Sequence, residues 1–142
     1  MKTLRDEIDL SISEAVFQSQ VIQLAHIHGW RVAHFRTGIG TQGRYMTPVQ
    51  ADGAGFPDLV MVKTFPDDNS ICLIAELKSE KGKLTIEQEE WLNQLNNVEG
   101  FYCFMWKPHD FNSMAQTLQS KGLVDIIDIW KKNVLYAEKY TK

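Results

Sequence analysis

Asp58, Glu76 and Lys78 are residues whose types and spacing suit chemistry at a phosphate group. Residues 70–79 read as a strand, and side-chain alternation places Glu76 and Lys78 on the same face of it. Asp58 begins a second predicted strand, over residues 58–63, and a turn joins the two strands as an antiparallel hairpin. The hairpin therefore brings Asp58 close to the end of the strand that carries the other two charges.

Two interpretations of this trio remain open at the level of sequence. In the first, Lys78 only neutralises Glu76 and Asp58, because charged groups at the end of an apolar strand need partners that offset their desolvation. In the second, the two carboxylates hold Mg²⁺ or Mn²⁺, which prefer oxygen ligands. The lysine then lies near an attacking water and favours its hydroxide form, while the metal polarises a phosphoryl oxygen. The second interpretation describes phosphodiester hydrolysis.

A helix over residues 12–28 is expected to position a further carboxylate. Ser11 and Glu14 have the spacing of a capping box before a periodic apolar segment, and Gly29 ends that segment. The same periodicity places Glu14 on or beside the apolar face of the helix. Its side chain is expected either to cap the helix only or to point into an active-site cleft.

A strand over residues 30–36 follows, and five glycines then punctuate residues 38–55. We expect a long, mobile loop there, and such loops usually serve a site. No acidic residue occurs between Glu14 and Asp52, and this stretch holds three of the four arginines. It forms either a basic face for a polyanion or a set of solvated surface charges.

The second half of the chain completes the predicted fold. Thr85 and Gln88 have capping-box spacing at the start of a helix that runs to about Asn97. A buried strand over residues 101–106 and a helix from Asp110 to Lys121 follow, before the remaining segment, residues 123–142. We therefore expect one α/β domain over residues 1–142, with a central mixed sheet flanked by helices in the order αβββαβα plus a C-terminal tail.

The bulk composition is that of a soluble globular domain. The chain has 142 residues, of which 44% are hydrophobic and 23% charged, and its net charge of −3 argues against a protein that coats nucleic acid nonspecifically. It contains no apolar run long enough to span a membrane, and its N-terminus does not resemble a signal peptide. A cytoplasmic location and two reduced core cysteines, Cys72 and Cys103, are expected.

Three lesser patterns have ordinary explanations. The run from Gly38 to Gly43 superficially resembles a dinucleotide-binding loop, but no helix follows it, so no nucleotide cofactor is expected. His26 and His28 are two residues apart on a helix and cannot share a face, which argues against a histidine metal pair. Several aromatic residues either pack in the core or stack on unpaired bases: Tyr45, Phe56, Trp91 and Trp106.

Several motifs together resemble a known family. The run from Gly55 to Asp58, followed by residues 75–78 (Ala-Glu-Leu-Lys), resembles the signature of the PD-(D/E)XK nuclease superfamily. The surrounding pattern is similar to its VRR-NUC (virus-type replication-repair nuclease) branch. The supporting segments lie within residues 13–120 and are residues 35–38, 81–85 with Gln88, and 100–106 with 110–111. Family members often have Asn where this chain has Thr37, directly after the arginine of the first of these segments.

The resemblance implies a restriction-endonuclease-like core and a set of roles. Asp58, Glu76, the main-chain carbonyl of Leu77 and Glu14 would bind Mg²⁺ or Mn²⁺, with Glu14 acting directly or through water. Lys78 would be the catalytic lysine, and Gln88 would help orient the site. Residues expected to contact nucleic acid are Arg36, Arg44, Gly38, Gly40, Lys81 and Lys83. For Lys81 and Lys83, which flank a glycine after the strand, an ordinary solvated turn is the alternative.

The family similarity suggests a structure-selective DNA endonuclease of phage type, in the host-cell cytoplasm if phage-encoded, that resolves four-way (Holliday) junctions in replication, repair or recombination. Symmetric cutting implies a homodimer, and Ile126, Ile127 and Trp130 in the tail are candidates for its interface. Two alternatives share the fold: a non-catalytic DNA-binding or assembly module, and a restriction-type, sequence-specific endonuclease.

Overall fold

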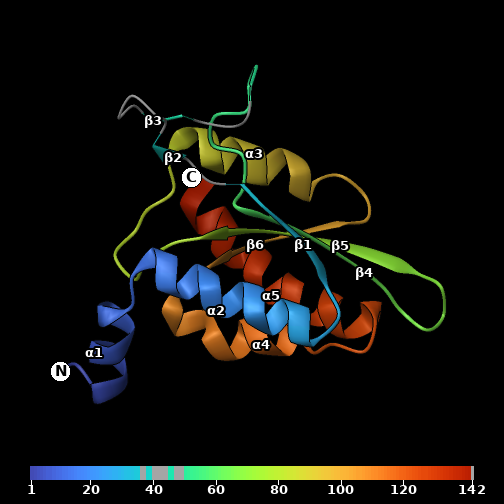
Figure 1. The fold of residues 1–142 in the computed structure, drawn as a ribbon, viewed down its shortest axis with the longest axis horizontal. Helices are drawn as coiled ribbons and strands as arrows, with labels where there is room; N and C mark the ends of the chain where they lie inside the picture. The colour runs from blue at the N-terminus through green and yellow to red at the C-terminus, as the bar shows by residue number, and fades with distance from the viewer. Residues whose placement is uncertain (36–37, 40–44, 47–49, 142) are drawn as a thin grey trace.

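The computed structural model of the protein describes residues 1–35, 38–39, 45–46 and 50–141 (Figure 1). Its helices are α1 (Leu4–Ser11), α2 (Glu14–Ile27), α3 (Ile86–Asn96), α4 (Phe111–Leu118) and α5 (Leu123–Thr141), with a short 3-10 helix, η1 (Pro108–Asp110), before α4. Its strands are β1 (Arg31–His34), β2 (Gly38–Ile39), β3 (Tyr45–Met46), β4 (Leu59–Thr64), β5 (Ser70–Leu77) and β6 (Phe101–Trp106). The expected order αβββαβα is confirmed for α2, β1, β4, β5, α3, β6 and α4.

The strands β1, β4, β5 and β6 form one mixed sheet in that order. The first two pairings are antiparallel, with His34 opposite Leu59 and Leu59 opposite Ala75, so the predicted hairpin of β4 and β5 is confirmed. The pairing of β5 with β6 is parallel and ends with Leu77 opposite Trp106. Strand β5 is thus flanked on both sides, and its C-terminal end lies beside the start of β4.

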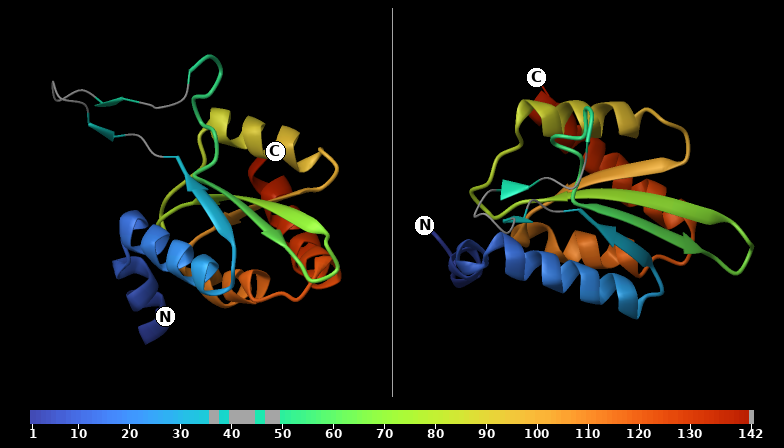
Figure 2. Two further views of the ribbon diagram at one scale, coloured as in Figure 1. Left: turned by 45° about the vertical axis from the view of Figure 1, so that its right-hand side comes forward. Right: turned by 45° about the horizontal axis from the view of Figure 1, so that its top comes forward.

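Helices cover both faces of this sheet, as Figures 1 and 2 show. Helices α2 and α4 lie side by side on one face, and α3 lies on the other. Alternation along β5 supplies both cores, because Leu73 faces the α2 and α4 side while Ile74 faces α3. This arrangement is consistent with a restriction-endonuclease-like core. Both cysteines are free; Cys103 is buried and Cys72 is half-buried, as expected.

The N-terminal region differs from the prediction. Residues 4–11 form helix α1, which the sequence pattern did not predict, and Ser11 belongs to it and donates its hydroxyl to the Ile8 carbonyl. Ser13 therefore caps α2, because its side chain accepts the Val16 N–H at 3.1 Å. The predicted capping box of Ser11 and Glu14 is wrong.

Two other boundaries were also predicted wrongly. Within the expected loop over residues 38–55, β2 and β3 pair as a two-stranded antiparallel sheet. The helix expected from Asp110 to Lys121 is η1 followed by α4, which ends at Leu118. Asp110 accepts the Lys107 N–H with its carboxylate and makes no side-chain cap bond to α4.

The C-terminal tail is a helix that packs on the domain. Helix α5 runs along the edge strand β6 and reaches α3 (Figure 1). Ile126 is completely buried in the main core, and Trp130 packs edge-on against Tyr102 and donates its indole N–H to Asn96. Ile126 is therefore not available for the dimer interface suggested by the sequence, whereas Ile127 and Trp130 are both partly exposed.

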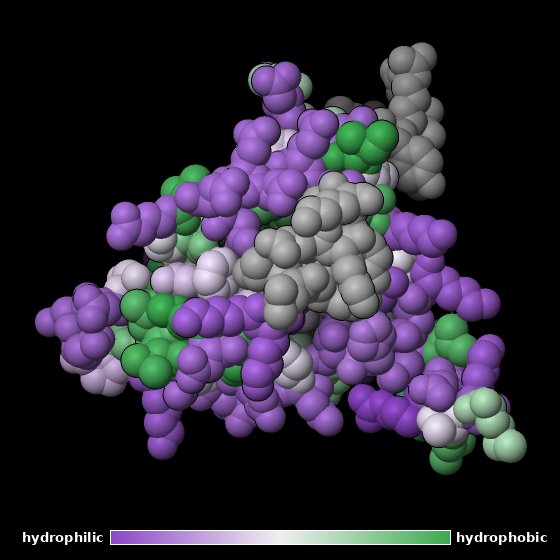
Figure 3. Space-filling view, turned by 180° about the vertical axis from the view of Figure 1, so that it is seen from behind, coloured by the Kyte–Doolittle hydropathy of each residue, from purple (hydrophilic) through white to green (hydrophobic). Residues whose placement is uncertain are grey.

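The surface seen from behind is mainly hydrophilic, with separate apolar patches (Figure 3). Large exposed apolar side chains occur on several helices and include Leu4, Val16, Ile27, Ile86 and Val124. Over the part of the chain that the structure describes, no helix combines the length and apolarity needed to cross a membrane.

Replacing Ile126 by alanine tests whether α5 belongs to the folding unit. Ile126 is fully buried, so we expect Ile126→Ala to lower the free energy of unfolding by about 2–5 kcal/mol. Val124 lies in the same helix but is 74% exposed, so Val124→Ala should change the free energy of unfolding by less than about 0.5 kcal/mol. Urea denaturation measures both values. Equal, small effects of the two substitutions would contradict the integral role of α5.

Candidate active site

Asp58 is held at the start of β4 by two backbone groups. Its carbonyl accepts the Phe35 N–H at 2.7 Å, and its carboxylate accepts the Leu77 N–H at 2.9 Å. Burial raises the pKa of Asp58, although the Leu77 N–H and the positive charges of Lys78 and His34 act in the opposite direction. The carboxylate is therefore fixed beside the end of β5, as the hairpin predicted.

Glu76 is a buried carboxylate on the α3 face of β5. Its side chain is 2% exposed, and Oε1 accepts a hydrogen bond from Gln88 Nε2 at 3.1 Å. Oε2 is also buried and has no hydrogen-bond partner among the residues that the structure describes. Two arrangements account for such an oxygen: a proton shared in a side-chain hydrogen bond with the neighbouring Asp58 carboxyl, or a cation bound by the two carboxylates.

Lys78 lies beside Glu76 on the same face, as alternation predicted. Its Nζ is 3.6 Å from Glu76 Oε1, and its N–H donates to the Trp106 carbonyl. The following turn packs on its aliphatic stem: a Cβ added at Gly82 would lie 3.1 Å from Lys78 Cβ and 3.2 Å from Lys78 Cδ. The absence of a side chain at residue 82 therefore leaves room for the lysine.

Gln88 connects the N-terminus of α3 to the site. The predicted capping box is confirmed: Thr85 accepts the Gln88 N–H, and Gln88 Oε1 accepts the Thr85 N–H at 2.9 Å. Because the backbone donor of Thr85 requires the amide oxygen, the amide nitrogen must face Glu76. One side chain thus starts the helix and donates a hydrogen bond to the buried carboxylate.

Glu14 approaches the site from α2, on the opposite face of the sheet. It lies in the first turn of that helix and is half-buried. Burial raises the pKa of Glu14; the nearby positive charge of Lys78 lowers it and the negative charge of Asp58 raises it. These effects place Glu14 within electrostatic reach of Asp58 and Lys78.

The site carries more negative charge than its own residues neutralise. Burial and the negative charge of Asp58 raise the pKa of Glu76 to about 9, although Lys78 acts against this rise. Glu14 adds to the repulsion. Among described residues, no three carboxylate, histidine or cysteine side chains converge as a ready-made metal cage. The donor set that is present therefore consists of two neighbouring carboxylates, Asp58 and Glu76, with Glu14 nearby.

The residues predicted to bind nucleic acid are placed only in part. Lys81 and Lys83 are exposed in the turn after β5 and line an open depression together with Glu80 and Lys107. Gly38 begins β2. The predicted contacts at Arg36, Arg44 and Gly40, and Thr37 beside them, lie outside the described residues.

Two positioning contacts were missed from the sequence. Gly55 has φ +83°, and a Cβ there would lie 2.6 Å from Glu87 Cβ, so the segment before Asp58 packs directly on α3. The Glu80 carboxylate accepts a hydrogen bond from the backbone N–H of His109 at 2.7 Å, and the Glu80 main-chain carbonyl accepts one from Lys107 Nζ. The glycine in Gly-Phe-Pro-Asp signals the first contact; the second joins distant residues and has no local signal.

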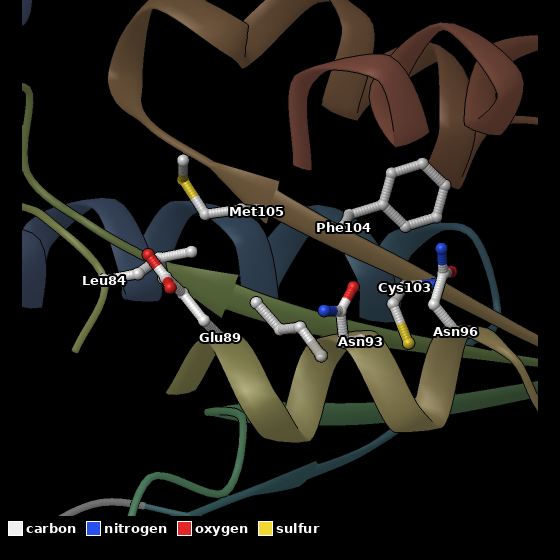
Figure 4. Close-up of a pocket in the computed structure, with 8 residues that line it drawn as sticks. Leu84, Glu89, Asn93, Asn96, Cys103, Phe104 and Met105 are labelled. Carbon is white, nitrogen blue, oxygen red and sulfur yellow. The ribbon is translucent and has the colours of Figure 1, made fainter. Parts of the chain in front are cut away.

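A small cavity under α3 is separate from the carboxylates of the site. Figure 4 shows the side chains that line it, which come from α3, from β6 and from the turn before α3. Its volume of about 20 Å³ accommodates about one water molecule. It is too small to bind a substrate.

Comparison with known proteins agrees with the resemblance drawn from the sequence. Residues 42–105 match the family model of the VRR-NUC domain. No curated protein and no solved structure matches the chain significantly.

The VRR-NUC match implies a nuclease-family role, for which DNA is the substrate class. It spans Asp58, Glu76, Lys78 and Gln88, which the structure brings together around the end of β5. Glu14 precedes the VRR-NUC match, so its association with the site rests on the tertiary structure alone.

The raised pKa of Glu76 predicts a pH-dependent stability. Between its ordinary pKa of 4.5 and about 9, the unfolded chain loses the Glu76 proton while the folded chain retains it, so folding stability falls as pH rises. We expect the metal-free protein to melt several degrees lower at about pH 8 than at about pH 5.5. Glu76→Gln should make the profile flatter, whereas exposed Glu99→Gln should not. Equal profiles for Glu76→Gln and wild type would contradict this assignment.

Gln88→Glu separates the two functions of Gln88. The variant keeps an acceptor for the Thr85 N–H but replaces the donor to Glu76 by a carboxylate, so α3 should form while the site is destabilised. We expect the free energy of unfolding at about pH 8 to fall by about 1–3 kcal/mol. Gln94→Glu, on the exposed side of the same helix, is the control. Denaturation curves that coincide for the two variants would rule out the proposed orientation of the amide.

Proposed function

We propose that this protein is a Mg²⁺- or Mn²⁺-dependent DNA endonuclease with Asp58, Glu76 and Lys78 at its catalytic centre. The observation that carries the proposal is the buried Glu76 Oε2, which has no hydrogen-bond partner among the described residues and lies in a cluster of carboxylates. Without a cation, Glu76 keeps a proton and shares it with Asp58 in a side-chain hydrogen bond, and a divalent cation bound by the two carboxylates would replace that proton.

The donor set fits a hard divalent cation. Asp58 and Glu76 supply carboxylate oxygens, which Mg²⁺ and Mn²⁺ prefer, and a cation would offset the burial that raises both pKa values and the repulsion by Asp58 that further raises that of Glu76. Strand geometry supports the Leu77 carbonyl as a third donor. The N–H and C=O of a strand residue point toward the same neighbour, and the Leu77 N–H points to Asp58. Glu14 would act directly or through water.

The chain's own groups prepare the reaction before substrate arrives. Gln88 and Lys78 both lie at Glu76 Oε1, which orients the carboxylate and leaves Oε2 available. The Lys78 ammonium supplies positive charge for a phosphate group and favours the hydroxide form of a neighbouring water. A bound metal ion would polarise the phosphoryl oxygen and activate the water for attack.

The proposed substrate is branched DNA, with four-way junctions preferred, as in structure-selective members of the resembling branch. Lys81 and Lys83 are exposed beside the catalytic strand and would contact phosphates, together with Arg36, Arg44, Gly38 and Gly40 from the preceding segment. Symmetric cleavage requires two active sites, so we propose a two-fold homodimer. Sedimentation equilibrium tests the dimer, and a monomer at high concentration would remove this part of the proposal.

A cleavage panel with matched variants tests the nuclease function. Duplex, single-stranded, flap and four-way-junction DNA are each incubated with Mg²⁺, with Mn²⁺ and with a chelator. We expect junction DNA to be cut fastest and chelation to abolish cutting. Asp58→Asn and Glu76→Gln should lower the rate by about two orders of magnitude or more. Glu99→Gln, at an exposed loop position, should cut like wild type.

Each alternative function gives a different result in this panel. DNA binding without cleavage under every metal condition would indicate a non-catalytic module. Cleavage of duplex DNA at defined sequences, with no preference for branched substrates, would indicate a restriction-type enzyme. Cleavage that survives both Asp58→Asn and the chelator would contradict the proposed site.

A further inference from the structure

Residues 50–57 lead directly into Asp58 and are fastened to helix α3 at three points. Trp91 Nε1 donates a hydrogen bond to the Asp52 carbonyl at 3.1 Å. The Phe56 ring meets the Trp91 ring edge-on, with centroids 5.1 Å apart. Gly55 approaches Glu87 so closely that no Cβ would fit between them. The segment is therefore attached to α3, the helix that also carries Gln88.

Phe56 makes a second edge-on contact, with Phe35, at a centroid distance of 5.5 Å. Phe35 follows β1 and donates its N–H to the carbonyl of Asp58 at 2.7 Å. Phe35, Phe56 and Trp91 thus form a chain of rings, here named the aromatic clasp. It joins the end of β1, the residues that precede Asp58, and α3.

The surroundings of Trp91 argue against a role in stacking on DNA bases. Trp91 borders an open groove whose other lining residues include Asp52, Glu87 and Glu90. Three carboxylates beside the ring would repel the phosphates on either side of a stacked base. Both the hydrogen bond of its indole and its ring contact are directed to the chain itself.

We propose that Trp91 is a positioning residue, which sets the place of the Asp58 carboxylate through the aromatic clasp and the hydrogen bond to Asp52. This proposal depends on one part of the proposed function, which is the role of Asp58 as a metal ligand at the catalytic centre. A carboxylate held within a fraction of an ångström binds a cation and promotes reaction much better than one that moves. Loss of the clasp therefore affects metal binding and kcat more than binding of DNA.

One hydrogen bond reports the position of Asp58 without any activity assay. The Leu77 N–H donates to the Asp58 carboxylate, so exchange of this amide proton with solvent measures how firmly the carboxylate is held. The Phe35 N–H, bonded to the Asp58 carbonyl, provides a second reporter. Both are followed residue by residue by NMR hydrogen exchange.

The experiment compares wild type with Trp91→Ala, Trp91→Phe and the control Gln94→Ala, an exposed position of the same helix. We expect Trp91→Ala to speed Leu77 amide exchange about tenfold or more, to weaken Mn²⁺ binding measured by calorimetry about tenfold, and to lower kcat with little change in KM. Trp91→Phe keeps a ring but lacks the donor to Asp52, so its effects should be smaller. Gln94→Ala should match wild type in every measurement.

Three results would overturn the proposal. The first is a folded Trp91→Ala variant with the same Leu77 exchange rate and the same Mn²⁺ affinity as Gln94→Ala, which would show that the clasp does not hold Asp58. A rise in KM with unchanged Mn²⁺ affinity would assign Trp91 to DNA contact instead. If Trp91→Ala does not fold, unchanged Leu77 exchange in Trp91→Phe overturns the proposal. A wild type that neither binds Mn²⁺ nor cuts DNA refutes the proposed function, while the exchange comparison still decides the clasp.

Discussion

The buried carboxylate of Glu76 is the constraint on which the candidate site depends. A charge at 2% exposure costs several kcal/mol unless partners compensate it, and here two compensating groups, Gln88 and Lys78, meet at the same oxygen. The second oxygen is also buried, and burial, followed by the negative charge of Asp58, raises the pKa of Glu76 to about 9. The folded chain therefore keeps in its sheet a carboxyl group whose ionised form is unfavourable. In the proposed function, this group is a ligand for the cation.

Helix α3 organises much of what surrounds this carboxylate. Its first turn contributes Gln88, whose amide is oriented by the same capping box that begins the helix. Two turns of the helix also hold the segment before Asp58, through Glu87 at Gly55 and through Trp91 at Asp52 and Phe56. The positions of Asp58 and Glu76 relative to each other thus depend on packing against α3 as well as on the β-hairpin.

Local patterns predicted the elements that carry the site because each depends on neighbouring residues. Alternation in β5 correctly placed Glu76 and Lys78 on one face, and the spacing of Thr85 and Gln88 correctly marked the start of α3. Local patterns failed where two elements meet. Ser11 was taken as the cap of α2 because α1 was not recognised, and Ile126 was assigned to a dimer interface although it completes the core.

The sequence by itself determined the types of chemical group, their order along the chain and their places on individual helices and strands. These follow from periodicity, capping and turn preferences, which act over a few residues. Only the tertiary structure decided that Glu14 approaches Asp58 across the sheet, that Glu76 Oε2 is buried without a described partner, and that Trp91 holds the residues before Asp58. Each of these depends on distances between segments far apart in the chain, which the packing of the whole core sets.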